Sequence, residues 1–497
     1  MTRRSPHGPL SDAAPRQQTI PFEETTDSEL RTIRNRSSTL RIIEDIESSR
    51  VPDARPADRP EADKEQNNLP PSRVDASSDT IAVSKNNELS KSPEKMGSPS
   101  VCRKLGPETV FRLSGLPINH NGSYFDEVQT KAVIGRAFNV DETGIFVDSL
   151  ANIPSSPCQT ATIRFLNVPL EVERKINSDG ELSVICRAAE NTTERLDLTL
   201  DVHFESFTPL YSPRNTDLDV IALPGLGGHP FGSFKARGKD YMWLRDGLPK
   251  SLPSARVHIY GYDSHLQNSD SFQNLQDLGL KFAHALITLR KNCQKERTGS
   301  RMFALIGQSL GGLVIKEALC HLFDHPDSHD EDFAFKYVTA VFFFGTPNSG
   351  MDISSLVPMV TGQPNEPFLR SIGRDSAVLE ELSKRWDKTT TTDRNCWPKF
   401  SIYSFYETKV SPTAAKIHMI DVFQVNGQWK MIGPPVALVD KNSAIHARPR
   451  EARDNNIHVP IDSTHSDMAK FKSSHDGAYR DNVVPWLRNI VDRKKTS

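Results

Sequence analysis

A serine stands between two glycines in the pentapeptide GQSLG, residues 307–311. Small residues two positions before and two positions after a serine permit a tight, strained turn that presents the hydroxyl as a nucleophile. The apolar run MFALI precedes this turn, and apolar residues at helical spacing follow it. A strand, a tight turn and a helix in this order predict a nucleophile elbow at Ser309. The alternative interpretation is a packing turn in which the serine has no chemical role.

A nucleophilic serine needs a general base, and the base needs an acidic group to orient it. Behind a strand–turn–helix elbow, the partners follow along the chain in the order acid, then histidine. His465 lies in the loop after the last predicted strand, so we expect it to be the base. Glu407 closes the preceding core strand and is the favoured acid, with Asp440 as its rival.

Two backbone N–H groups would stabilise the oxyanion that forms during acyl transfer. Leu310 follows the nucleophile, and Leu226 lies in the glycine-rich segment LPGLGGHP after the first core strand. Glycines in that segment let the backbone approach a substrate closely. The segment has neither the Gly-Lys-Ser/Thr nor the GxGxxG pattern of nucleotide-binding loops. Since the sequence also lacks metal-ligand spacings, we expect no cofactor and no metal.

The elements that must position these residues lie between residues 216 and 492. Apolar runs alternate there with helical patterns; the runs are LDVIALPGL, ARVHIYGYDS, RMFALIG, YVTAVFFFGTP, FSIYSFYET and NNIHVPI. Near-continuous apolar strands separated by helices predict a doubly wound, mostly parallel sheet covered on both faces, an α/β class. Ligands bind such sheets at the carboxyl ends of the strands. The candidate residues all lie at or just after strand ends, as this class requires.

Residues 108–208 have a different pattern. The segments TVFRLSGLP, GIFVDSLANI, QTATIRFLN and LTLDVHFESF read as strands, and FDEVQTKAVIGRAF has helical spacing. This order predicts a small α+β module of the ferredoxin-like type. RNA-recognition modules share the topology, but CQTATIRF lacks their glycine–aromatic pattern. An interaction or support module is therefore favoured, and no nucleic-acid partner is expected.

Composition and charge indicate which further segments and partners the protein is expected to have. Residues 1–105 contain one aromatic residue, Phe22, among many prolines, serines and charged residues, which predicts a disordered tail suited to protein partners. A net charge of -2 disfavours nucleic-acid binding driven by bulk charge. The six cysteines show neither disulfide nor zinc spacing. No secretory signal opens the chain, and no apolar stretch of about eighteen residues occurs, so we expect an intracellular protein without a membrane-spanning helix.

These segments, taken in order, resemble motifs of lipase-like α/β-hydrolases: DVIALPGLGGHPFGSFK, YMWLRDGLPKSLPSARVHIYGYDS, LIGQSLGGLVIKEAL, FFFGTPNSG, SFYET and HVPIDSTHSDMAKF. The resemblance is to the serine-active-site-containing protein family, and also to the lipase-like domains of fungal NACHT and ankyrin proteins. It implies a Ser/acid/His esterase or lipase acting on ester or lipid substrates, including phospholipid. It further implies peripheral contact with mitochondrial or reticular membranes, or a role in fungal self-recognition.

Three positions depart from the family's pattern. Pro224 stands where histidine usually precedes glycine in the oxyanion segment, Gln308 replaces the histidine before the serine, and Asn348 replaces histidine in GTPNSG. The departures motivate an alternative function, a weakly active or inactive hydrolase-fold regulator, and a transacylase is a third hypothesis. Residues 350–395 include the apolar stretch ISSLVPMV, which we expect to form a cap that binds an acyl chain.

Overall fold

The computed structural model describes residues 105–118, 124–189, 192–295, 302–325, 334–392, 400–418, 427–445 and 456–496. The predicted tail, residues 1–105, lies outside the described residues except for Leu105. Its expected disorder and its role in partner binding therefore stay predictions.

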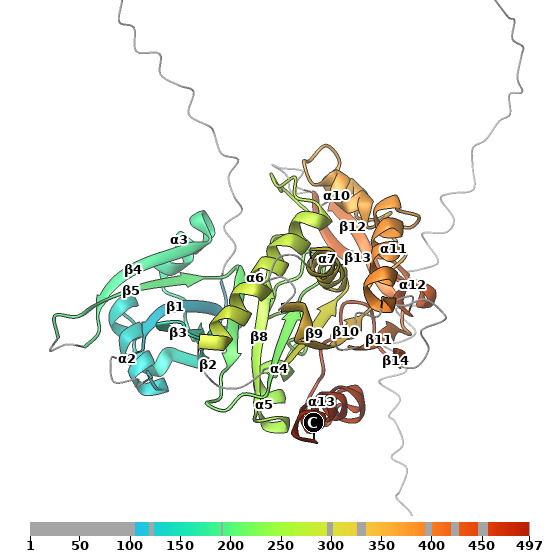
Figure 1. Ribbon diagram of the computed structural model, residues 1–497. Coiled ribbons are helices and arrows are strands. Elements are labelled where there is room, and N and C mark those ends of the chain that lie inside the picture. Colours follow the sequence, from blue (N-terminus) through green and yellow to red (C-terminus); the bar gives the residue numbers. More distant parts are fainter. Residues whose placement is uncertain are drawn as a thin grey trace, which may run out of the picture. The chain divides into compact units, whose positions relative to one another are not determined.

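The first folded part is an accessory module with a five-stranded antiparallel sheet of order β2-β3-β1-β5-β4 (Figure 1). Its elements are β1 (Phe111–Pro117), α2 (Glu127–Phe138), η1 (Glu142–Gly144), β2 (Ile145–Asn152), β3 (Cys158–Phe165), α3 (Leu170–Asp179), β4 (Glu181–Arg187) and β5 (Arg195–Asp201). Asp126 and Gln129 form a capping box that begins α2. The order is the predicted ferredoxin-like one, with β4 added as an edge strand that pairs with β5.

The strand predicted over LTLDVHFESF is in fact two strands. β5 ends at Asp201, whose side chain accepts hydrogen bonds from the N–H groups of His203 (3.1 Å) and Phe204 (2.8 Å). Phe204 has a φ of 55°, so the chain turns sharply there. The next strand, β6 (Ser206–Tyr211), joins the second sheet. That sheet therefore begins at residue 206, whereas the sequence pattern placed its start at 216.

The second sheet has seven strands in the order β14-β11-β10-β9-β7-β8-β6. The strands are β6, β7 (Leu218–Leu223), β8 (Ala255–Gly261), β9 (Met302–Gln308), β10 (Val338–Phe344), β11 (Ser401–Glu407) and β14 (Asn456–Ile461). All neighbouring pairs are parallel except β6 with β8. The six apolar runs are the parallel strands, and the predicted α/β-hydrolase class is confirmed.

Helices cover both faces of this sheet (Figure 1). Phe303 and Leu305 of β9 pack with residues of α6 (Leu275–Lys295), α7 (Leu310–Asp324) and α11 (Ala377–Thr391). Ala304 and Ile306 point to the other face, which is covered by α4 (Trp243–Asp246), α5 (Leu248–Ser251), η3 (Tyr479–Val483) and α13 (Val484–Thr496). Successive side chains of a strand point to opposite faces, so an apolar run without alternation is what a doubly covered strand requires.

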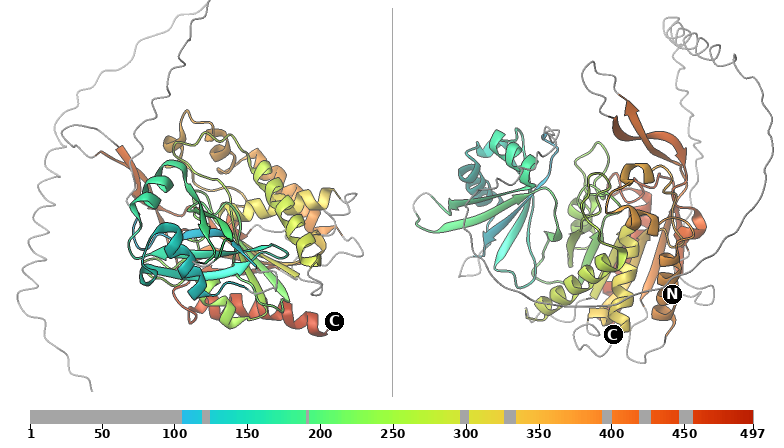
Figure 2. Two further views of the ribbon diagram at one scale, coloured as in Figure 1. Left: turned by 90° about the vertical axis from the view of Figure 1, so that its left-hand side faces the viewer. Right: turned by 90° about the horizontal axis from the view of Figure 1, so that it is seen from above.

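Smaller elements lie between the core strands. They are α9 (Val357–Val360), α10 (Glu366–Ser371), β12 (Ser411–His418), β13 (Gly427–Val436) and α12 (Lys441–Ile445). Figure 2 shows the antiparallel hairpin of β12 and β13 projecting from the sheet. Among the described helices, none is both long enough and apolar enough to span a bilayer.

Two arginines of the accessory module pair with aspartates of the module and also bond to residues beyond it. The Arg112 guanidinium lies 2.7 Å from Asp201, and it also donates to the Glu205 carbonyl and the Thr208 hydroxyl. On the same face of the module's sheet, Arg164 pairs with Asp148 at 2.7 Å and contacts Asp240 at 3.4 Å. RNA-recognition modules bind RNA on this sheet face. Here that face contacts the rest of the chain, which favours the support role.

Candidate active site

The turn that carries Ser309 is strained and crowded. Ser309 has a φ of 51° and a ψ of -120°, in a region that residues other than glycine rarely adopt. A Cβ atom on Gly307 would lie 2.5 Å from the Gly312 Cα, and one on Gly311 would lie 2.5 Å from the Pro224 carbonyl oxygen. Both glycines are therefore required by packing, and the turn has the geometry of a nucleophile elbow.

Three of the candidate residues come together in one hydrogen-bonded chain. His465 Nε2 lies 2.8 Å from Ser309 Oγ, and His465 Nδ1 lies 2.6 Å from Glu407 Oε2. Since the carboxylate can only accept, Nδ1–H donates to Glu407, and Nε2 is left to accept the proton of Ser309. The exposed fractions are only 3% for Ser309, 5% for His465 and 9% for Glu407. This arrangement can deprotonate the serine in a site with little water.

The order of the strands explains why distant residues meet. Ser309 follows β9, Glu407 ends β11, and β10 lies between those two strands. His465 lies in the loop after β14, the neighbour of β11. Its backbone N–H donates to Ser411 Oγ at 2.9 Å, and its carbonyl accepts from Gln308 Nε2 at 3.4 Å. Gln308, one of the three departures, therefore helps to hold the histidine loop.

The two rival acids occupy different places. Glu407 contacts His465 through Oε2, and its Oε1 accepts a hydrogen bond from the Val439 N–H at 3.2 Å. Asp440 is exposed, and its carboxylate accepts from the Ser443 N–H at 2.9 Å, which caps the start of α12. The structure thus brings Glu407 to the histidine and gives Asp440 a local structural role.

Asn348, another of the departures, supports the same region. Its Nδ2 lies 2.8 Å from the Ser443 carbonyl oxygen and 3.2 Å from those of Thr346 and Ala444. These contacts tie the GTPNSG turn to α12, which begins two residues after Val439. The sequence marked Asn348 only as a departure and did not indicate this contact, because Ser443 is remote along the chain.

The two candidate oxyanion donors are Leu310, within the elbow, and Leu226, in the segment that packs against it. Leu310 is the first residue of α7, where the N–H groups have no acceptor within the helix and favour negative charge. The segment with Leu226 passes directly against the nucleophile, since a Cβ on Gly225 would lie 2.9 Å from the Ser309 Cβ. Neither the Leu226 N–H nor the Leu310 N–H donates to any described residue. Both remain able to bind an oxyanion.

A tyrosine that sequence reasoning missed holds the oxyanion segment in place. The Tyr262 hydroxyl donates to the Pro224 carbonyl at 2.6 Å, and the Gly227 N–H donates to both Ser264 O and Ser264 Oγ at 3.0 Å. Burial raises the pKa of the Tyr262 phenol well above its usual value, so the hydroxyl keeps its proton and donates. Tyr262 directly follows β8 at the carboxyl end of the sheet, which was the available sequence signal.

Replacing Tyr262 by phenylalanine should lower kcat for ester hydrolysis about tenfold and leave KM within about twofold, because the oxyanion segment loses an anchor. The matched control is Tyr211→Phe, which removes a hydroxyl bonded to the Pro253 carbonyl at 3.2 Å. Steady-state kinetics and thermal unfolding of both variants provide the measurement. Equal kinetic effects in the two variants would contradict this role for Tyr262.

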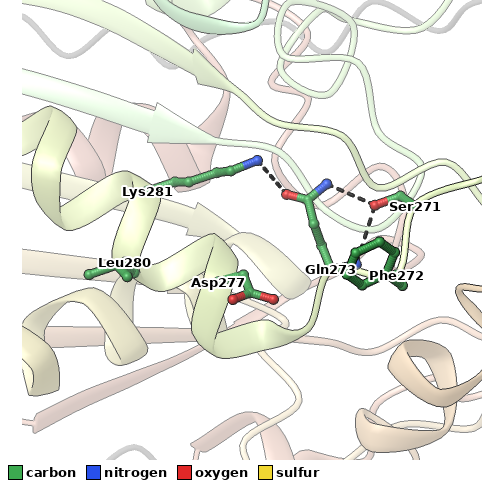
Figure 3. Close-up of a pocket in the computed structure, with 6 residues that line it drawn as sticks. All are labelled: Ser271, Phe272, Gln273, Asp277, Leu280 and Lys281. Carbon is green, nitrogen blue, oxygen red and sulfur yellow. Dashed lines mark hydrogen bonds between the residues drawn. The ribbon is translucent and has the colours of Figure 1, made fainter. Parts of the chain in front are cut away.

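Other parts of the surface offer weaker candidates. A depression of about 380 Å³ lies beside α6. Figure 3 shows its lining residues; Lys281 Nζ donates to Gln273 Oε1 at 2.6 Å, and Gln273 Nε2 donates to Ser271 Oγ at 2.8 Å. Ser271 and Lys281 both line it, but each is hydrogen-bonded to Gln273, and no hydrogen bond between the two is seen among the described residues, so they do not form a nucleophile–base pair there. Within the described parts of the chain, no group of three or more His, Cys, Asp and Glu side chains could hold a metal ion.

No family model matches the chain. Protein SERAC1 of Danio rerio is 22% identical over 213 residues, which are 38% of this chain and 30% of the relative's length. Among solved structures, the mature lipase BlEst2 of Bacillus licheniformis is 14% identical with a TM-score of 0.33, covering 57% of this chain and 97% of its own. The NocB thioesterase domain is 13% identical with a TM-score of 0.29, covering 57% and 99%.

Proposed function

We propose that this protein is a serine hydrolase that cleaves carboxylic esters. The observation that carries the proposal is the continuous hydrogen-bonded chain from Ser309 through His465 to Glu407, built on a strained elbow. Ser309 is the nucleophile, His465 is the general base, and Glu407 holds the imidazole in the tautomer that accepts a proton. The first test is covalent labelling of the purified protein by a fluorophosphonate probe, with Ser309→Ala as the reference.

The proposed reaction proceeds through an acyl-enzyme. Ser309 Oγ attacks the carbonyl carbon while its proton moves to His465 Nε2, and the carbonyl electrons move to the oxygen. The N–H groups of Leu226 and Leu310 stabilise that oxyanion. When the carbonyl re-forms, the bond to the alcohol oxygen breaks, and His465 gives the proton to the leaving alcohol. Water then repeats the sequence, and Ser309 regains its proton as the acid leaves.

We further propose that the acyl chain of the substrate is apolar, as in lipid esters. Leu226, Leu266, Val357 and Met359 are half-buried and pack against the same apolar core that includes Leu310. The cap segment is joined to the loop after β8, because Asn365 Nδ2 donates to the carbonyls of His265 (2.8 Å) and Leu266 (3.0 Å). An apolar cap beside the oxyanion segment supports an acyl-binding role. Intracellular location and peripheral contact with a mitochondrial or reticular membrane stay predictions.

Replacing Val357 by aspartate should lower kcat/KM for a long-chain ester roughly tenfold more than for an acetyl ester, because a carboxylate there opposes burial of the acyl chain. Pro358→Asp, at the exposed neighbouring position, controls for the added charge. The measurement is kcat/KM for p-nitrophenyl esters of increasing chain length. Equal losses of kcat/KM on the acetyl and long-chain esters would contradict the cap proposal.

The alternative function is a weakly active or inactive hydrolase-fold regulator in signalling or fungal self-recognition. The geometry of the three departures does not favour it. The Pro224 carbonyl contacts Tyr262, Gln308 contacts the histidine loop, and Asn348 contacts α12. None of these departures separates the serine from the histidine. A transacylase would use the same acyl-enzyme with an alcohol as acceptor, and the ratio of acid to ester products distinguishes it from a hydrolase.

A further inference from the structure

A cavity of about 680 Å³ lies between the accessory module and the loops that follow β7 and β8. The module contributes Leu105, Glu108, Thr109, Val110, Ile176, Asn177, Val202 and His203. The second sheet contributes residues 227–232, Lys235, Tyr262, Ser264 and His265. A volume of this size accommodates a small organic group. The accessory module therefore forms one wall of a cavity whose other wall is formed by the loops of the second sheet.

The cavity borders the oxyanion segment. Gly228 lines the cavity, and its N–H donates to the Gly225 carbonyl at 2.9 Å. Gly225 in turn lies against Ser309, and the cavity-lining Tyr262 and Ser264 anchor the same segment. Ser309 itself does not line the cavity. The cavity therefore adjoins the segment that packs against Ser309.

One wall of the cavity is held by a neutral histidine. His229 Nε2–H donates to the Val202 carbonyl at 2.8 Å, and His229 Nδ1 accepts from the N–H groups of Phe231 (3.1 Å) and Gly232 (3.2 Å). Burial lowers the pKa of His229, so the ring stays neutral and keeps this pattern. The contact to Val202 links the loop after β7 to the end of the module. The cavity is therefore formed before any ligand arrives, which lowers the entropic cost of binding.

The lining mixes donors and acceptors without an excess of charge. Lys235 and Glu108 carry opposite charges, Asn177 supplies an amide, and Thr109 and Ser264 supply hydroxyls. Phe231, Tyr262, His203 and His265 add rings to the lining, and Leu105, Val110, Ile176, Val202 and Pro230 add apolar surface. Hydroxyl groups donate and accept at the same time, so a ligand with several hydroxyls matches such a lining. An anion would face Glu108, and a cation would face Lys235.

We propose that this cavity binds the hydroxyl-rich alcohol portion of the ester substrate, a polyol of the glycerol or sugar type. The inference rests on the proposed hydrolase function and deepens it, since it names the class of alcohol that leaves when Ser309 is acylated. The accessory module then determines substrate specificity, and its contacts with the second sheet keep the cavity closed on that side.

The kinetic test compares glyceryl monohexanoate with hexyl hexanoate, two esters with the same acyl chain. Asn177→Trp places a large ring in the cavity from α3 and should lower the ratio of kcat/KM for the glyceryl ester over the hexyl ester at least about tenfold. Lys175→Trp, at an exposed position of the same helix, should leave that ratio unchanged. An unchanged ratio in the Asn177 variant would overturn the proposal.

A binding test does not depend on catalysis. Ser309→Ala protein, which cannot form the acyl-enzyme, is titrated calorimetrically with 1-O-hexylglycerol, hexyl glucoside and hexan-1-ol. One or both polyol ligands should bind at least about tenfold more tightly than hexan-1-ol, and Asn177→Trp should remove the difference. Equal binding of all three ligands contradicts the polyol site. Absence of Ser309 labelling and of any ester hydrolysis would instead reject the hydrolase function, while the titration still decides what the cavity binds.

Discussion

Ser309→Ala and His465→Ala should each lower ester hydrolysis by at least about 10⁴-fold. The serine variant should take no fluorophosphonate label, and the histidine variant should be labelled far more slowly than the wild type. The physical reason is that a serine hydroxyl is a poor nucleophile until a base accepts its proton. The 2.8 Å contact between Ser309 Oγ and His465 Nε2 is the only contact of this kind that the structure shows for this serine within the described residues.

Two control variants test whether the loss is specific to Ser309 and His465. His475→Ala removes an exposed histidine ten residues downstream of His465, and Ser178→Ala removes an exposed serine of the accessory module. Both should keep wild-type labelling and hydrolysis. Because Ser309 and His465 are buried, circular dichroism and thermal unfolding must show that their variants fold. A folded wild-type protein that hydrolyses no ester and takes no label would favour the regulator function instead.

Glu407→Gln should lower kcat by roughly 10²- to 10⁴-fold and change KM little, because the amide keeps the shape of the side chain but loses its charge. The carboxylate accepts the Nδ1–H of His465 at 2.6 Å and stabilises the imidazolium that forms when Ser309 gives up its proton. An amide can turn its NH₂ group toward Nδ1 and favour the wrong tautomer. Steady-state kinetics measures the loss, and labelling of Ser309 should slow in parallel.

The rival acid supplies the matched control. Asp440→Asn should retain wild-type kcat, since asparagine also caps helices well and Asp440 lies at the start of α12. Any change should be confined to thermal stability, at no more than about 1 kcal/mol. A large loss of kcat in Asp440→Asn together with a small loss in Glu407→Gln would reverse the assignment of the acid.

The parallel strands could be predicted because burial on both faces leaves a simple local signal, a continuous apolar run closed by glycine or a polar residue. The boundary between the two sheets could not be predicted in this way. Residues 195–211 are β-favouring on both sides of Phe204, and the break depends on Asp201 bonding the backbone beyond it. Propensity alone therefore merged β5 and β6 into one strand.

The elbow at Ser309 was determined by the sequence itself, because strain, small neighbours and the strand-to-helix change all lie within about a dozen residues. The succession of strands along the chain, and the place of each candidate residue at or after a strand end, also followed from local patterns, whereas the order of the strands in the sheet came from the structure. These features depend on which residues are adjacent in the chain.

Only the tertiary structure decided between Glu407 and Asp440 as the acid. It alone also showed the hydrogen bond from Tyr262 to the oxyanion segment and the cavity beside the accessory module. Each depends on side chains that meet across long stretches of chain, such as the 58 positions between Glu407 and His465 or the 38 between Pro224 and Tyr262. Composition and periodicity carry no information on such distances. Packing of the sheet and the module decides which polar groups face one another, and that packing sets the chemistry of the site.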